Sequence, residues 1–107
     1  MGREGLGEFE HRVLLAILRL GSESYSVPIV MELEGRTGKP VAPAAVYIAL
    51  RRLEARDLVS SRMAIGEESG LARRYFRVEE TGLERLQESR RELEALWDGL
   101  DPVLTKR

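Results

Sequence analysis

Arginine is the residue type in this sequence that is best suited to bind a partner, and it is unevenly distributed. The chain has 107 residues, 17 Lys+Arg against 18 Asp+Glu, and a formal net charge of −1. Residues 36–77 nevertheless hold nine basic and four acidic side chains, a charge of +5, which leaves −6 for the remainder. Guanidinium groups bind phosphate and read guanine through paired hydrogen bonds. A basic middle between acidic ends therefore indicates nucleic acid, although a genomic bias toward arginine codons would also give fifteen arginines.

Cysteine and histidine, two residue types that often carry out catalysis, are nearly absent. There is no cysteine, which excludes thiolate catalysis, disulfides and cysteine-ligated metal, and His11 is the single histidine. We expect His11 on the surface of its helix, with no partner that would make it a pH sensor. The sequence has no phosphate loop and no carboxylate pair at the spacing of a cleft. It therefore predicts no enzyme, no catalytic residue, no metal and no cofactor.

Length and composition predict one small globular domain. Apolar residues make up 43% and charged residues 33% of the chain. The longest apolar run, residues 13–18, is far shorter than the roughly 20 residues that span a membrane, and the first residues lack the pattern of a secretion signal. We therefore expect a cytoplasmic, nucleoid-associated protein without a membrane partner. Residues 1–7 hold three glycines and are expected to be flexible.

The elements that must position the arginines are three short helices, according to the apolar periodicity. Residues 8–20 predict a helix that is apolar around most of its circumference and ends at Gly21. A second helix is expected from Ser26 as its N-cap to residues 35–38, and Pro43 opens a third. The core stripe of the third helix is Val46, Leu50 and Leu53. Its outer side is small at its start and basic further on, with Ala44, Tyr47, Ile48, Arg51 and Arg52.

The second half of the chain predicts a hairpin and a long helix. Residues 58–64 and 72–78 are expected to be two strands, and Phe76 and Val78 alternate with Tyr75 and Arg77 in the second. A helix over 79–100 ends at Asp101-Pro102. The predicted fold class is mainly α with a small β-hairpin: a winged helix-turn-helix over residues 8–78, a C-terminal dimerisation helix over 79–101 and a tail over 102–107. An apolar seam with one polar break follows the long helix at 3-4 spacing. Together with the over-apolar first helix it gives the expected dimer interface: Leu14, Leu18, Leu83, Leu86, Arg90, Leu93, Trp97 and Leu100.

Two stretches of the sequence carry a resemblance to a known family. Residues 47–59 read YIALRRLEARDLV and residues 72–82 read ARRYFRVEETG. Together with residues 6–10 and the Tyr25-Ser26 pair, they resemble the PadR family of bacterial winged-helix transcription regulators over residues 6 to about 100. Two features depart from the family pattern at helix starts: Val41-Ala42-Pro43 lacks the usual Ser or Thr cap, and Glu79 stands in place of a Thr.

The resemblance implies a homodimer that binds a double-stranded DNA operator, usually as a repressor, with the third helix in the major groove and the last helix in the dimer contact. By this resemblance Tyr47 would bind a backbone phosphate. Some members of the family bind a small aromatic or cationic ligand at the dimer interface, where Trp97 could stack on it. The predicted DNA-binding residues are Lys39, Ala44, Tyr47, Ile48, Arg51, Arg52, Arg73 and Arg74. Ala44 and Ile48 can meet only apolar groups, which favours thymine methyls beneath the start of the helix.

Other interpretations remain open at this level. The arginines could form an ordinary solvated face of a winged-helix protein-interaction module that never touches DNA. The apolar seam could pair with the first helix inside a monomer, and Trp97 could be a simple hydrophobic anchor. Arg90 could fix the register of the seam, bind an anion or extend to solvent. Glu67 and Glu68 give the expected hairpin tip an acidic charge, which opposes its insertion into a DNA groove.

Overall fold

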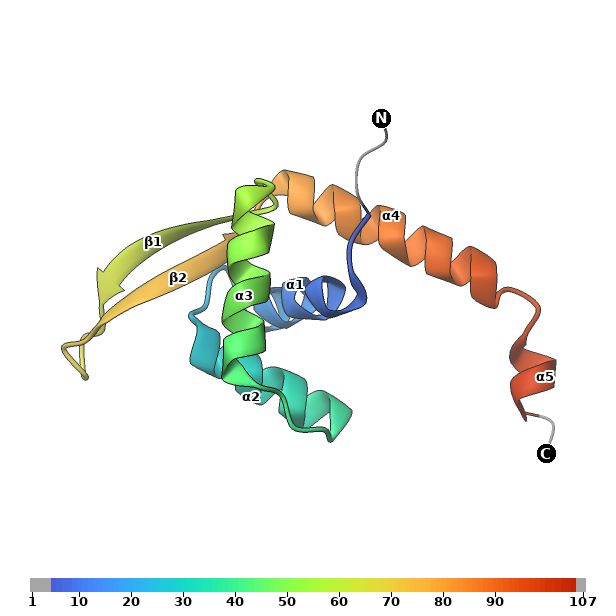
Figure 1. Ribbon diagram of the computed structural model, residues 1–107, viewed down its shortest axis with the longest axis horizontal. Helices are drawn as coiled ribbons and strands as arrows, with labels where there is room; N and C mark the ends of the chain where they lie inside the picture. The colour runs from blue at the N-terminus through green and yellow to red at the C-terminus, as the bar shows by residue number, and fades with distance from the viewer. Residues whose placement is uncertain (1–4, 106–107) are drawn as a thin grey trace.

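Seven elements make up the part of the chain that the computed structural model describes, residues 5–105. They are α1 (Glu8–Leu20), α2 (Ser26–Thr37), α3 (Pro43–Ala55), β1 (Val59–Ile65), β2 (Ala72–Val78), α4 (Glu80–Trp97) and α5 (Asp101–Thr105). The first three helices pack together, the β-hairpin projects to one side and α4 runs away from the other (Figure 1). The predicted fold class, mainly helical with a small hairpin in a winged-helix arrangement, is confirmed.

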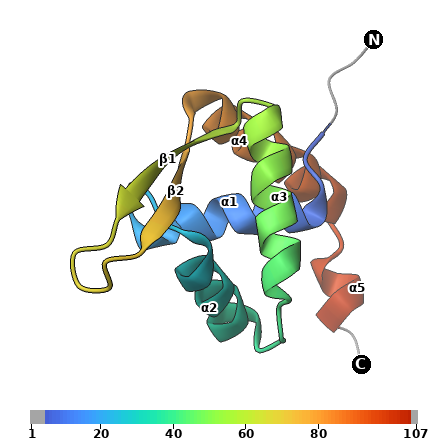
Figure 2. The ribbon, with the colours of Figure 1, turned by 60° about the vertical axis from the view of Figure 1, so that its left-hand side comes forward.

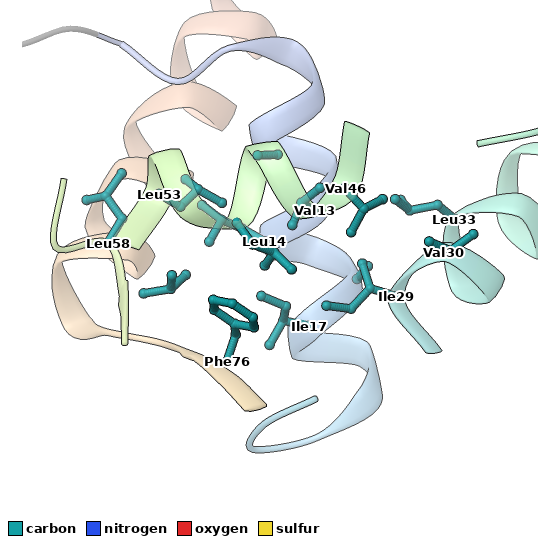
Figure 3. Close-up of a cluster of buried hydrophobic side chains, with 14 of the residues drawn as sticks. Val13, Leu14, Ile17, Ile29, Val30, Leu33, Val46, Leu53, Leu58 and Phe76 are labelled. Carbon is teal, nitrogen blue, oxygen red and sulfur yellow. The ribbon is translucent and has the colours of Figure 1, made fainter. Parts of the chain in front are cut away.

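The core lies where α1, α2, α3 and the base of the hairpin meet (Figure 3). Val46, Leu50 and Leu53 of α3 are fully buried, so the stripe that the sequence predicts does face the core. Burying side chains of this size stabilises the fold by about 1.5–3 kcal/mol each. Because the stripe fixes the rotation of α3, it also fixes which residues of this helix are presented to a partner.

The helix α2 has no side-chain cap at its start, and the turn to α3 is held by Thr37, Gly38 and Glu34. Ser26 is the first residue of α2 and Tyr25 its N-cap, without a side-chain cap bond, so the predicted cap is wrong by one residue. Gly38 ends α2 in the left-handed conformation at φ 71°. The Glu34 carboxylate accepts a hydrogen bond of 2.9 Å from the Val41 N–H, which ties this turn to α2.

The hairpin pairs its strands antiparallel, with Ser61 opposite Phe76 and Met63 opposite Arg74. The first strand lies one residue later than predicted. Ser24, in the loop before α2, extends the sheet beyond β2: its N–H donates to the Phe76 carbonyl at 2.9 Å and its carbonyl accepts from the Phe76 N–H at 2.8 Å. This bridge fastens the hairpin to the helices, and sequence periodicity gave no sign of a strand one residue long.

The helix α4 begins in tight contact with the turn after α3. A Cβ added to Gly82 would lie 2.3 Å from the Leu58 carbonyl oxygen, so only glycine fits there. The helix ends at Trp97 rather than at residue 100, and Gly99 takes a left-handed φ of 81°. Asp101-Pro102 therefore starts α5 instead of ending the long helix, which suits a proline in a first helical turn. Residues 102–105 of the predicted tail are thus helical.

Two further expectations change near the N-terminus. Residues 1–4 and 106–107 lie outside the described residues, but Leu6 packs against the core and Gly7 caps α1, so residues 6 and 7 belong to the fold. His11 is half-buried and its Nδ1 lies 2.8 Å from the Ser89 hydroxyl of α4, where the sequence predicted no partner. Burial lowers the pKa of His11 below its ordinary value of 6.5.

Candidate nucleic-acid interface

The outer face of α3 is exposed to solvent, and in Figure 2 this helix lies toward the viewer, in front of α1. Tyr47 is 44% exposed and Ile48 51% exposed, and Ala44, Arg51 and Arg52 are exposed beside them. The structure therefore places all five on the surface that the sequence predicts. Their part in binding stays a prediction.

Arg51 and Tyr47 form one unit on this face. Arg51 Nη1 donates to the Tyr47 hydroxyl at 3.1 Å, and its guanidinium carbon lies 5.9 Å from the centre of the Tyr47 ring. This hydrogen bond raises the pKa of Arg51. Arg52, the next residue, has no ion pair within residues 5–105. This face therefore carries one arginine that is hydrogen-bonded to a tyrosine and one arginine without an ion pair.

The two adjacent arginines of β2 point to opposite faces of the hairpin, because side chains alternate along a strand. Arg74 Nη1 donates to the Ser61 hydroxyl at 3.0 Å, and Ser61 donates to the Glu54 carboxylate of α3. Arg73 lies instead over the ring of Tyr25, with its guanidinium carbon 4.4 Å from the ring centre. The sequence grouped these arginines as one basic pair, whereas only Arg74 is connected to α3.

The face that carries Arg73 is a cluster of stacked cations and rings. Tyr25 and Tyr75 meet edge to face at 5.5 Å, and the Arg62 guanidinium lies 5.5 Å from the centre of the Tyr75 ring. Arg62 also pairs with Glu23 through two hydrogen bonds, which lower the pKa of Glu23. Cations that lie over aromatic rings are attracted by the negative face of the ring. These contacts hold the hairpin against the loop before α2.

Lys39 and the hairpin tip lie at the edges of this surface. Lys39 is exposed in the turn before α3, next to the start of that helix. The tip spans residues 66–71, where Glu67 and Glu68 are exposed. Ile65, just before the tip, and Leu71, its last residue, are 71% and 61% exposed. The tip is therefore acidic and apolar, while the cations lie further back on the strands.

Comparisons with known proteins agree with this geometry. The sequence matches the family described as "Transcriptional regulator PadR-like family" over residues 14–88, which is most of the chain. The chain belongs to this PadR-like family. The prediction from residues 47–59 and 72–82 is thereby confirmed, and this PadR-like regulator has the winged-helix DNA-binding fold of its family.

Solved structures give the same result. A PadR family regulator from Eggerthella lenta is 28% identical, with a TM-score of 0.71 over 92% of this chain and 89% of that one. A PadR-like regulator from Bacillus cereus is 20% identical, with a TM-score of 0.75 over 92% and 93% of the two chains. F93 from STIV, a winged-helix DNA-binding protein, shares the fold at 11% identity and a TM-score of 0.68, over 90% and 98%. A search of curated proteins found no match.

The expected dimer surface of this PadR-like regulator needs correction at two positions. Leu14 is 0% exposed and Leu86 6% exposed, so both belong to the core of their own chain and we remove them from that surface. The other predicted positions are all exposed: Leu18, Leu83, Arg90, Leu93, Trp97 and Leu100. Further exposed apolar residues that the prediction missed lie within a few positions of them in the sequence: Leu15, Leu96, Val103 and Leu104. Arg90 pairs with Glu94 at 2.9 Å on the surface of α4.

Two other classes of site are not found among residues 5–105. No three histidine, cysteine, aspartate or glutamate side chains gather as metal ligands. None of the helices in this part of the chain combines the length and the apolar character that crossing a membrane requires.

Proposed function

We propose that this PadR-like regulator binds a pseudo-palindromic DNA operator as a homodimer and represses transcription. The observation that carries the proposal is the exposed face of α3, where Tyr47, Arg51 and Arg52 stand on a helix whose other side is anchored in the core. Helices on this kind of fold enter the major groove with such residues. F93, described as a DNA-binding protein, supports the proposal by its shared fold.

The dimer is supported by the apolar face of α4 and α5, which the rest of residues 5–105 leaves uncovered. Leu93, Leu96 and Trp97 are 48%, 72% and 53% exposed. Monomeric proteins rarely expose a continuous apolar patch of this kind. A second copy is the partner that covers it, because a two-fold axis then presents two α3 helices to sites about 34 Å apart on one side of a duplex.

The two halves of α3 would recognise different chemical groups of the DNA. Ala44 and Ile48 carry no hydrogen-bonding side-chain atoms, so they fit thymine methyl groups at the start of the helix. Arg51 and Arg52 bind phosphate or guanine further along it. We therefore expect an A·T pair in each half-site beneath Ala44 and Ile48.

Release from the operator would follow binding of a small aromatic ligand at the dimer interface. Trp97 supports this role because about half of its side chain is uncovered at the end of α4. An indole ring stacks well on an aromatic molecule. A ligand that changes the packing of α4 would also change the separation of the two α3 helices.

The test is a selection of duplexes from random-sequence DNA by the purified protein, followed by fluorescence anisotropy at several salt concentrations. We expect a dimeric mass, selected sites with two-fold symmetry and an affinity that falls steeply with salt. A single-chain mass at micromolar concentration, together with no binding to any duplex in dilute buffer, contradicts the proposal. That outcome favours a winged-helix module that binds proteins.

A further inference from the structure

A carboxylate lies between the two basic elements of the proposed DNA-binding surface. Glu54 Oε1 is 3.8 Å from Arg51 Nε on the same helix. Its other oxygen accepts a hydrogen bond from the Ser61 hydroxyl of β1, and that hydroxyl accepts one from Arg74 Nη1 of β2 at 3.0 Å. One acidic side chain thus connects an arginine of α3 with an arginine of the hairpin.

A negative charge on this surface is unfavourable for binding DNA, because it repels the phosphates that the neighbouring arginines attract. About a third of the Glu54 side chain is exposed, so burial does not hide the charge from an approaching duplex. The contacts of Glu54 give the compensating benefit. Arginine side chains have many rotamers, and fixing two of them before binding removes the entropy that DNA would otherwise have to overcome.

We propose that Glu54 is a positioning residue that sets sequence specificity: it holds Arg74 through the Ser61 hydroxyl, and its ion pair with Arg51 adds to the hydrogen bond that Arg51 donates to Tyr47. The inference rests on the proposed function and names a determinant of its selectivity. Arg51 belongs to the helix that reads the groove, and Arg74 belongs to the hairpin that flanks it. When both are held, a duplex must present matching groups to both at once, and sequences that do not match lose a contact.

The neighbouring Arg73 lies outside this arrangement. Its guanidinium stacks on Tyr25, on the face of the hairpin that is turned away from Ser61 and Glu54. A loss of Arg73 therefore weakens binding to every sequence by a similar factor. A loss of the connection through Glu54 weakens binding to the preferred sequence more than to others.

The experiment compares Glu54→Gln with Glu68→Gln, using a duplex selected by the wild type and a random-sequence duplex. Each variant removes one negative charge, but Glu68 is exposed at the hairpin tip. Charge alone predicts tighter binding to both duplexes for both variants. Positioning predicts that Glu54→Gln lowers the ratio of selected to random affinity by about tenfold, the scale of one well-placed arginine contact. Glu68→Gln is expected to leave that ratio unchanged.

Ser61→Ala is the second variant, because it breaks the connection to Arg74 without a change of charge. We expect it to lower the same ratio, and thermal unfolding followed by circular dichroism verifies that each variant is folded. If Glu54→Gln does not fold, the result with Ser61→Ala decides. An unchanged ratio in the folded variants overturns this inference alone. A wild type that binds no duplex overturns the proposed function and this inference with it.

Discussion

The dimer can be tested with the only tryptophan of the chain, which lies on the proposed interface. Trp97 is 53% exposed in the single chain. Burial between two copies moves indole emission to shorter wavelength, so dilution of the protein is expected to shift the emission back as the dimer dissociates. The midpoint of this shift gives the dissociation constant without any label. The informative perturbation is Leu96→Ala, one position away, which leaves the reporter in place.

The magnitude follows from the exposure of Leu96. Its side chain is 72% exposed, and complete burial of a leucine is worth about 1.5–3 kcal/mol. Burial of that exposed part beneath a partner therefore contributes on the order of 1.5 kcal/mol in each protomer. A two-fold interface contains the residue twice, which gives about 3 kcal/mol for the dimer. At about 1.4 kcal/mol for each factor of ten, the dissociation constant is expected to rise roughly 100-fold.

Leu71→Ala is the matched control, since Leu71 is 61% exposed but lies at the hairpin tip. We expect it to leave the midpoint unchanged. The reasoning is refuted if Leu96→Ala leaves the midpoint where it is in the wild type. It is refuted equally if Trp97 emits as an exposed indole at every concentration while sedimentation reports a single chain.

Three other perturbations address the fold and the DNA surface. Gly82→Ala is expected to lower the free energy of unfolding by about 3 kcal/mol in urea titrations, because its Cβ would lie 2.3 Å from the Leu58 carbonyl oxygen. The free energy of unfolding is expected to fall as the pH drops below 6.5. Burial lowers the pKa of His11 in the folded state, so the unfolded chain takes up the proton first. In a series of melting temperatures measured at different pH, His11→Gln should flatten this decline. Arg52→Ala is expected to weaken binding to selected and random duplexes alike and to reduce the salt slope by about 2 per dimer, as anisotropy titrations would show.

The sequence predicted the orientation of α3 well and the use of the apolar surface of α1 and α4 poorly. Three buried residues at i, i+4 and i+7 determine how a helix is rotated, so the exposed face of α3 followed directly. The helix α1 is apolar around most of its circumference, and periodicity does not distinguish the side that faces its own core from the side left for a partner. Leu14 was assigned to the wrong side for this reason. Leu86 lies on the same apolar stripe of α4 as Leu93, and periodicity does not show that the start of that stripe packs on its own core.

The end of α4 shows how competing local signals misled the prediction. Proline was taken as the stop, but a proline is well tolerated in the first turn of a helix, where Pro102 stands. Gly99, three residues earlier, adopts the left-handed conformation at which the chain changes direction.

The hairpin arginines were misjudged for a different reason: the alternation of side chains along a strand already requires that Arg73 and Arg74 face opposite ways. The contacts with Tyr25 and with Ser61 depend on tertiary packing and have no signal in the sequence.

Ion pairs in the folded chain change how the charge distribution along the sequence should be interpreted. The sequence gives residues 36–77 nine basic side chains, but five of these form ion pairs: Arg36, Arg51, Arg56, Arg62 and Arg77. Four of the five partners come from outside that stretch: Glu32, Glu10, Glu23 and Glu79. The acidic ends of the sequence thus fold back onto its basic middle, and segregation along the chain is partly cancelled in space. Within residues 5–105 the cations of the stretch that have no ion pair are Lys39, Arg52, Arg73 and Arg74. Counterion release counts the phosphates that are neutralised, and these four cations can neutralise a phosphate without first leaving a carboxylate.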